Sequence, residues 1–425
     1  MLDRRQFLEV STAAAFAGAL AGSSPGAEPS ARKKLALITT ELRSRSHSQH
    51  MGDRFLVGYP HQGEWHKPAC DIVSLYVDQK PAGDLSGQRA KEFGLKLYPT
   101  IAEALRNGGK KLAVDGVLLI GEHGDYPVNE YGQKKYPRYE FFKQIAQVFE
   151  EDGQVAPVFN DKHLSWNFDW AKEMVETAGK MKFPFMAGSS LPVSWRMPAV
   201  DLPWEAEVEE VLCVGFGPVD IYDFHNLEAL QCIAERRMGG ETGIVSVQGV
   251  RGDAVWEIVK NDFWQKGGVS QKLLQACLSR SQTLAQAREG FNHRYPTLDE
   301  MKSLAKKPLA YRFEYRDGVK GTLFLLDGLV EDMTVAAQIK NQPKPFSTLV
   351  YLPPGPNVVY SAALMSKVEQ MFLTGKAAYP VERTLLTSGL VSAALQSLGT
   401  GGKLLKTPHL DVRYVAPQES QFARE

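Results

Sequence analysis

Short apolar runs alternate with amphipathic stretches between residues 34 and 187. Strands are predicted at 34–39, 71–77, 95–98, 114–120, 157–159 and 184–187. Helices are predicted between them at 86–93, 101–107, 139–151 and 169–180. Short strands alternating with helices are typical of βαβ units, which build a parallel sheet. The pattern therefore predicts an N-terminal Rossmann-like α/β domain.

Polar residues follow several of these strands at their carboxyl ends. In open parallel sheets, ligands bind beyond these ends. The residues predicted to bind a cofactor there are Thr39, Thr40, Asp78, Gly121, Glu122 and His123. Asp78 stands where an acid would hold a ribose hydroxyl, although an acid that caps a loop is equally common at such a position.

The pattern changes after residue 195. Longer alternating runs predict strands at 243–250, 310–315, 322–326 and 346–352 and helices at 220–237, 359–373 and 385–397. This is typical of an α+β domain with an open, mainly antiparallel sheet. We therefore expect one domain over 32–195 and a second over 196–425. An exposed face on the open sheet would favour a homo-oligomer.

The first 31 residues have the order of a signal peptide. Arg4 and Arg5 are followed by an apolar run over 10–21 and then by small residues and proline. A run of this length is shorter than the roughly 20 residues that a membrane span requires. The paired arginines indicate the twin-arginine route, so we expect an exported, periplasmic protein.

The composition of the chain argues against several classes of function. Lysine plus arginine and aspartate plus glutamate both number 49, so the net charge is zero and no basic excess indicates nucleic-acid binding. The four cysteines include no C-x-x-C pair, so we expect buried free thiols rather than a metal site. His47, His50, His61 and His66 are interpreted as parts of one polar loop and not as metal ligands. No later segment is long and apolar enough for a membrane span.

Four segments, taken in order, resemble the glucose–fructose oxidoreductase/inositol dehydrogenase/rhizopine-catabolism (Gfo/Idh/MocA) family. Residues 77–101 are similar to its acid-ended second strand, following helix and third strand. Residues 114–120 are similar to its fourth strand. Val158-Phe-Asn-Asp-Lys-His-Leu164 stands where the family has Glu-Lys-Pro, and residues 222–228 resemble its helix with the catalytic aspartate and histidine.

The resemblance implies hydride transfer between NAD or NADP and a sugar or polyol. It assigns Lys162 to orienting the substrate and His225 to acid–base catalysis. Asp220 or Asp223 would orient His225, because a carboxylate fixes the tautomer of its imidazole partner. The family's aspartate lies four residues before its histidine, and that position is Ile221 here.

The largest departure from the family affects the cofactor. The first strand of a dinucleotide-binding fold is normally followed by G-x-G-x-x-G, which lets the backbone approach the pyrophosphate. Residues 36–51 contain no glycine. Ser44, Ser46, Arg43 and Arg45 would either hold a phosphate with their side chains or form a solvated loop. In addition, the lysine is followed by His163 instead of proline, and a role for His163 stays open.

Two hypotheses therefore remain. In the first, the protein is an exported oxidoreductase that holds NAD(P) tightly in an unorthodox first loop. In the second, the fold lacks a dinucleotide, and the protein binds carbohydrate or processes it by non-redox chemistry at Lys162 and His225. The two differ in whether residues 43–50 leave room for a dinucleotide beside that pair.

Overall fold

The computed structural model describes residues 31–285, 289–290, 294–353, 355 and 357–424. The predicted signal peptide lies almost wholly outside the described residues. Among the described residues, no helix has the length and apolar character needed to cross a membrane.

Six parallel strands form the first sheet, in the order β5-β4-β1-β6-β7-β8. Their bounds are Lys96–Leu97, Cys70–Val77, Lys33–Thr39, Gly116–Ile120, Val158–Asp161 and Phe185–Gly188. When the strands of this sheet are numbered along the chain, their order is the 3-2-1-4-5-6 of doubly wound sheets. The order in which strands are added reverses between β1 and β6. The predicted Rossmann-like sheet is confirmed.

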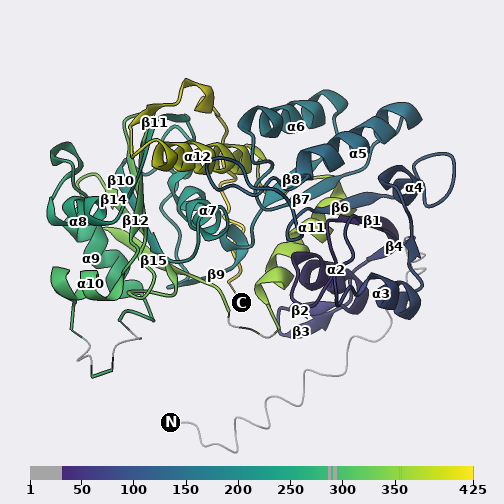
Figure 1. Cartoon of the computed structure of the whole chain (residues 1–425), viewed down its shortest axis with the longest axis horizontal. Helices are drawn as coiled ribbons and strands as arrows, with labels where there is room; N and C mark the ends of the chain where they lie inside the picture. Colours follow the sequence, from purple (N-terminus) through teal and green to yellow (C-terminus); the bar gives the residue numbers. More distant parts are fainter. Residues whose placement is uncertain (1–30, 286–288, 291–293, 354, 356, 425) are drawn as a thin grey trace, which may run out of the picture. The chain divides into compact units, whose positions relative to one another are not determined.

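Helices cover both faces of this sheet because its central strands are apolar on both sides. On one face, Ile38, Val117 and Leu119 pack with α4 (Ile101–Leu105), α5 (Arg138–Asp152) and α6 (Phe168–Met181). On the other face, Leu37 and Leu118 pack with α2 (His47–Val57) and α11 (Tyr360–Thr374). The C-terminal stretch of the chain therefore supplies part of the first sheet's cover (Figure 1). Helix α3 (Ser86–Phe93) ends at Gly94 in the left-handed conformation, as its sequence predicts.

Eight strands form the second sheet, in the order β16-β11-β12-β13-β10-β14-β15-β9. Their bounds are Leu405–Lys406, Ile244–Arg251, Leu309–Tyr315, Lys320–Leu325, Val208–Gly215, Met333–Ile339, Phe346–Tyr351 and Trp195–Met197. Every pair is antiparallel except β10 with β13. The predicted mainly antiparallel sheet is confirmed, whereas the domain boundary at residue 195 stays a prediction.

Both faces of the second sheet are covered by helices of the same chain. Val211 and Cys213 on β10 belong to the core shared with α7 (Tyr222–Ala234) and α12 (Glu382–Gly399). Leu212 and Val214 belong to a separate core with α8 (Asp253–Lys260), α9 (Gln271–Arg280) and α10 (Leu298–Leu304). Among the described residues, both faces of this sheet therefore carry packed helices, and the homo-oligomer stays a prediction.

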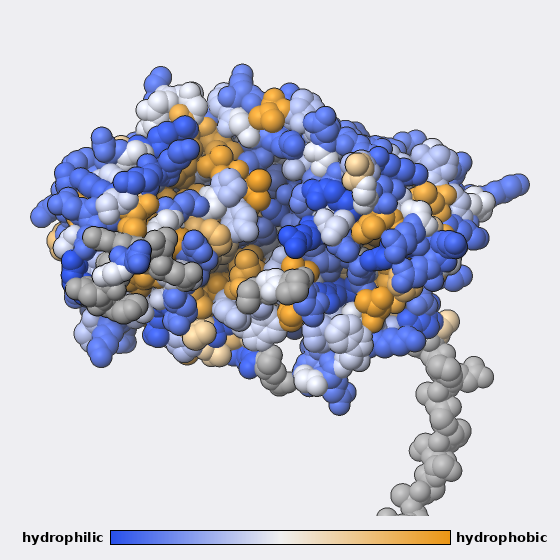
Figure 2. Space-filling view, turned by 60° about the horizontal axis from the view of Figure 1, so that its bottom comes forward, coloured by the Kyte–Doolittle hydropathy of each residue, from blue (hydrophilic) through white to orange (hydrophobic). Residues whose placement is uncertain are grey.

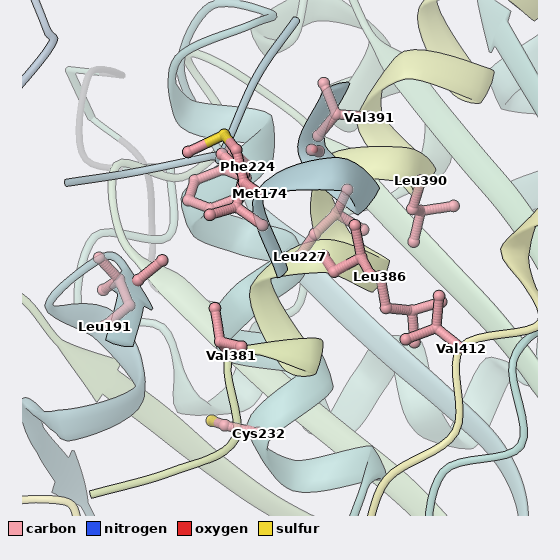
Figure 3. Close-up of a cluster of buried hydrophobic side chains, with 14 of the residues drawn as sticks. Met174, Leu191, Phe224, Leu227, Cys232, Val381, Leu386, Leu390, Val391 and Val412 are labelled. Atoms are coloured by element: carbon pink, nitrogen blue, oxygen red, sulfur yellow. The ribbon is translucent and has the colours of Figure 1, made fainter. Parts of the chain in front are cut away.

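Helix α12 connects the two halves of the core. Its Leu386 and Leu390 belong to one buried cluster with Leu227 of α7 and Met174 of α6, and Figure 3 shows part of this cluster. Because α6 covers the first sheet and α7 the second, a single apolar cluster joins both sheets. The four cysteines are buried and form no disulfide, as predicted.

The predicted polar loop around His47, His50, His61 and His66 is wrong. Residues His47–Val57 form α2, which is capped by Ser46, and Tyr59–His61 and Glu64–His66 form the β2–β3 hairpin. The predicted helix at 220–237 is shorter, because Asp220 adopts a left-handed φ of 62° and α7 begins only at Tyr222.

Candidate functional site

A cavity of about 260 Å³ lies at the carboxyl edge of the first sheet. Loops after β1, β6, β7 and β8 supply most of its wall, and the first turns of α7 and α11 close it. Its polar lining residues are Arg45, His47, His50, Glu122, His123, Tyr136, Asp161, Lys162, Ser189, Ser190, Tyr222, His225 and Tyr360. Four of the predicted site residues therefore meet here: Glu122, His123, Lys162 and His225.

Lys162 is held rigidly at the end of β7. It adopts a left-handed φ of 62°, and its N–H donates to the carbonyl of Gly188 at the end of β8, 3.1 Å away. Its side chain is 1% exposed. Its Nζ lies 3.3 Å from Glu122 Oε1 and donates to the carbonyl of Ile221 at 3.4 Å. A buried ammonium is thus fixed at the cavity wall.

Glu122 is the counterion of this lysine. Its carboxylate pairs with Lys162 through one oxygen and with the buried Arg138 through the other. Burial acts to raise the pKa of Glu122, but the charges of Lys162 and Arg138 outweigh it and hold the pKa well below its usual range. Glu122 is therefore ionised, and two cations share one carboxylate.

His225 presents a neutral imidazole to the cavity. It lies on α7, and its Nδ1 has no hydrogen-bond partner among the described residues. Burial, followed by the charge of Lys162, lowers the pKa of His225 well below its usual value. A neutral ring has one nitrogen able to accept a proton, which is what acid–base catalysis requires.

Neither predicted aspartate partner lines the cavity beside His225. Asp223 is fully buried, and its carboxylate accepts from the Tyr311 hydroxyl at 2.8 Å and from the Phe224 N–H. Asp220 Oδ2 accepts from the Lys134 N–H, and its Oδ1 lies 3.9 Å from His163 Nε2. Burial and the neighbouring Asp223 raise the pKa of Asp220 to about 7. The hydrogen bonds of both carboxylates therefore lead to partners other than His225.

Three further histidines line the cavity, and two of them were not predicted to do so. The ring of His47 lies 5.1 Å from the rings of both His50 and His123. His47 Nδ1 lies 2.6 Å from Asp161 Oδ2. Burial lowers the pKa of His123 to about 4 and that of His50 further, so both rings are neutral. No group of side chains in the described part of the chain has metal-binding geometry.

The residues after β1 do not fit a dinucleotide in the position that this fold normally gives it. That position needs free N–H groups at the start of the helix after β1. Here the Ser46 hydroxyl accepts from the N–H groups of Arg43 and Gln49. The N–H of His47 points to Nδ1 of His123, 3.5 Å away. The N–H groups that a pyrophosphate would need after β1 are therefore directed at partners within the chain.

The other predicted cofactor-binding residues have partners of their own. The buried Thr39 and Thr40 donate their hydroxyls to the carbonyls of Ile120 and Glu122. The two oxygens of Asp78 accept from the hydroxyls of Tyr76 and Tyr126. A Cβ on Gly121 would lie 2.6 Å from Cγ of Arg138, so this glycine makes room for Arg138. The side chains of Thr39, Thr40 and Asp78 therefore all have hydrogen-bond partners within the chain.

Comparisons with known proteins place the fold. No known protein family and no curated protein matches the sequence. Solved structures do match: GenD2 from gentamicin A biosynthesis, in complex with NAD, has a TM-score of 0.55 at 10% identity over 91% of this chain and 99% of that chain.

Two inositol dehydrogenases also match. Myo-inositol 2-dehydrogenase from Lactobacillus plantarum has a TM-score of 0.51 at 12% identity over 88% of this chain and 99% of its own. Myo-inositol dehydrogenase from Lactobacillus casei, in complex with NAD(H) and myo-inositol, has a TM-score of 0.52 at 11% identity over 88% of this chain and 96% of its own. The chain therefore shares the fold of these three proteins, a Rossmann-like parallel sheet followed by a mainly antiparallel sheet.

Proposed function

We propose that this protein is an enzyme that binds a small sugar or polyol in the cavity at the edge of the first sheet and exchanges protons with it. One observation carries the proposal: Lys162 and His225, which are 63 positions apart in the sequence (162 to 225), line the same cavity. One supplies a fixed positive charge and the other a neutral base.

The two side chains have complementary roles. The ammonium of Lys162 stabilises negative charge that develops on a substrate oxygen, because it is already in place and shielded from water. The neutral ring of His225 accepts a proton from a hydroxyl or from a carbon next to a carbonyl. Glu122 holds the ammonium of Lys162 in position through their ion pair. This arrangement supports an isomerisation, epimerisation or elimination without a redox cofactor.

The lining of the cavity favours a neutral, hydroxyl-rich ligand. Hydroxyls of Ser189, Ser190, Tyr136, Tyr222 and Tyr360 surround it, and its charged groups have both signs. Ser189 Oγ has no hydrogen-bond partner among the described residues, and the same is true of His50 Nδ1. Hydroxyl groups of a sugar both donate and accept, so they satisfy such a mixed lining.

A ligand screen tests this function. Purified protein is melted with single sugars, polyols and sugar acids, and each ligand that raises the melting temperature is incubated with the enzyme and followed by NMR. We expect conversion of at least one ligand by wild type and none by Lys162→Met. A ligand that binds and is returned unchanged would make this a carbohydrate-binding protein instead.

Hydride transfer with NAD or NADP is the second candidate. The sheet order and the fold shared with NAD complexes favour it. It requires the start of α2 to separate from His123, because the N–H of His47 points to His123 Nδ1 in the structure. The protein is denatured and the supernatant analysed for nucleotide by mass spectrometry. A stoichiometric nucleotide would establish this candidate; no nucleotide, and no change in melting temperature with added NAD(H) or NADP(H), would exclude it.

We further propose export by the twin-arginine route, based on Arg4, Arg5 and the apolar run that follows. The test compares wild type with an Arg4→Lys/Arg5→Lys variant by cell fractionation. We expect wild type in the periplasm and the variant in the cytoplasm. Wild type in the cytoplasm would contradict export.

A further inference from the structure

A second cavity, of about 370 Å³, lies beside the β2–β3 hairpin, α11 and the C-terminal tail. Its residues Val359, Ala363, Ser366 and Lys367 share one face of α11, because they recur at helical spacing. Figure 2 brings this side of the molecule forward and shows hydrophobic and hydrophilic side chains interspersed on it. None of these residues lines the first cavity.

The charged side chains of this cavity are cationic. Lys367 and Arg424 line it together with His61, and no carboxylate is among its described lining residues. No ion pair or hydrogen bond joins the ammonium of Lys367 to any described residue. Burial lowers the pKa of Lys367. An unpaired, partly desolvated ammonium is costly, and an anion would remove that cost.

Arg424 is only weakly neutralised. Its guanidinium lies 3.8 Å from Asp201 Oδ2, but Asp201 also pairs with Arg196 and, at 3.6 Å, with Arg236. Three arginines thus share a single carboxylate. The described lining of the cavity, which includes Lys367 and Arg424 and no carboxylate, therefore keeps an excess of positive charge.

The rest of the wall is apolar. Val193, Val359 and Phe422 line it, together with Trp195. The centre of the Phe422 ring lies 4.2 Å from the guanidinium carbon of Arg196 and 4.1 Å from that of Arg424. This wall suits a flat or aliphatic group, which would displace water on binding.

The geometry points to a second ligand site, in which a small organic anion places its carboxylate or phosphate at Lys367 and Arg424 and its apolar body against Val193, Trp195 and Phe422. This site is separate from the sugar site and does not depend on the proposed reaction.

Three probes test the site by ligand-observed NMR titration: benzoate, phenyl phosphate and the uncharged benzyl alcohol. We expect at least one anion to bind wild type and benzyl alcohol to bind at least tenfold more weakly, because the alcohol cannot form a charge-assisted contact with Lys367 or Arg424. The stronger anion shows whether the site prefers a carboxylate or a phosphate. Absence of binding by both anions would overturn the proposal.

Paired variants locate the binding. Lys367→Met removes the ammonium and keeps a long side chain, whereas Lys376→Met alters an exposed lysine just beyond the same helix. We expect the affinity for the anion to fall about tenfold or more in Lys367→Met and to stay unchanged in Lys376→Met. Equal affinity in both variants would place the anion elsewhere and refute the assignment.

A measurement on wild type covers the case in which Lys367→Met does not fold. Lysines are modified with trinitrobenzenesulfonate, with and without the tighter anion, and each site is quantified by mass spectrometry. We expect the anion to slow modification of Lys367 at least fivefold and to leave Lys376 unchanged. Unprotected Lys367 would contradict the site.

Discussion

The carboxyl edge of the first sheet has two regions with opposite character. At β1 and β6, where this fold normally holds a dinucleotide, Thr39, Thr40 and the N–H of His47 have partners within the chain, whereas His50 Nδ1, which lines the cavity, has none among the described residues. At β7 and α7, His225 Nδ1 and Asp161 Oδ1 are buried without one. Buried polar groups without partners are rare in folded proteins. The difference favours a ligand site in the cavity that His225, Asp161 and His50 line.

The largest expected effect comes from removing the charge at β7. Lys162→Met leaves Glu122 paired with Arg138, so the fold is preserved while the positive charge at the substrate is lost. We expect kcat to fall by about 10²–10³ or more on the sugar found in the screen. The control is Lys172→Met, at an exposed position of α6. Full activity of Lys162→Met would contradict the proposed role of Lys162 in stabilising negative charge on the substrate.

The next effect concerns the base. We expect His225→Gln to lower kcat by about 10² or more, since general acid–base groups contribute roughly 10²–10⁴. Because the pKa of His225 is depressed, wild-type activity should not fall as the pH drops from 8 to 6 on account of this residue. A kinetic pH profile checks this, with the exposed His409→Gln as the matched variant. A profile that falls near pH 6.5 in wild type and not in an active His225→Gln would contradict the assignment.

Asp220 gives a smaller, pH-dependent effect on stability. Its pKa is raised to about 7 in the folded protein, above its ordinary value, so its protonated form is preferred on folding. Its contribution to stability is therefore present at low pH and lost as the pH rises through about 7. We expect Asp220→Asn to stabilise the protein by about 2 kcal/mol at pH 8 and by much less at pH 5.

Denaturant unfolding of Asp220→Asn at the two pH values measures this, with the exposed Asp125→Asn as control. Equal stabilisation at both pH values would show that Asp220 is not a buried, perturbed carboxyl. Activity of the same variant shows whether Asp220 also acts at the cavity.

The smallest expected effect is on stability and concerns Gly121, the residue that follows β6. A Cβ at residue 121 would lie 2.6 Å from Arg138 Cγ, so Gly121→Ala should cost about 1–3 kcal/mol of stability. Gly87→Ala, in an open position of α3, should be neutral or slightly stabilising. Thermal melts compare the two. An unchanged Gly121→Ala variant would mean that Arg138 has room to move, and that this glycine is free for another role.

Much of the fold was predictable because its core strands contain short apolar runs, such as 117–120, bounded by clear turn residues. Helix α2 was not, because its buried face includes His50 and Arg54. Arg54 is stabilised there by bonds to Ser361 and to the carbonyl of Asn357, more than 300 positions away. Local periodicity contains no information about such partners.

The candidate site shows the same limit. Lys162 and His225 were found through short motifs that resemble a family. His47 and Asp161 were missed as a pair because 114 residues separate them, and only the sheet order brings them to 2.6 Å. A usable signal was nevertheless present: histidines at 47 and 50 follow the first strand, where the fold normally has glycines.

The cover that α11 gives to the first sheet also sets the order of folding during synthesis. Leu37 and Leu118 lack part of their packing until residues 360–374 have left the ribosome. N-terminal domains usually fold first as the chain emerges. Here the first sheet is synthesised early, but one of its apolar faces gains its full cover only when α11 is added.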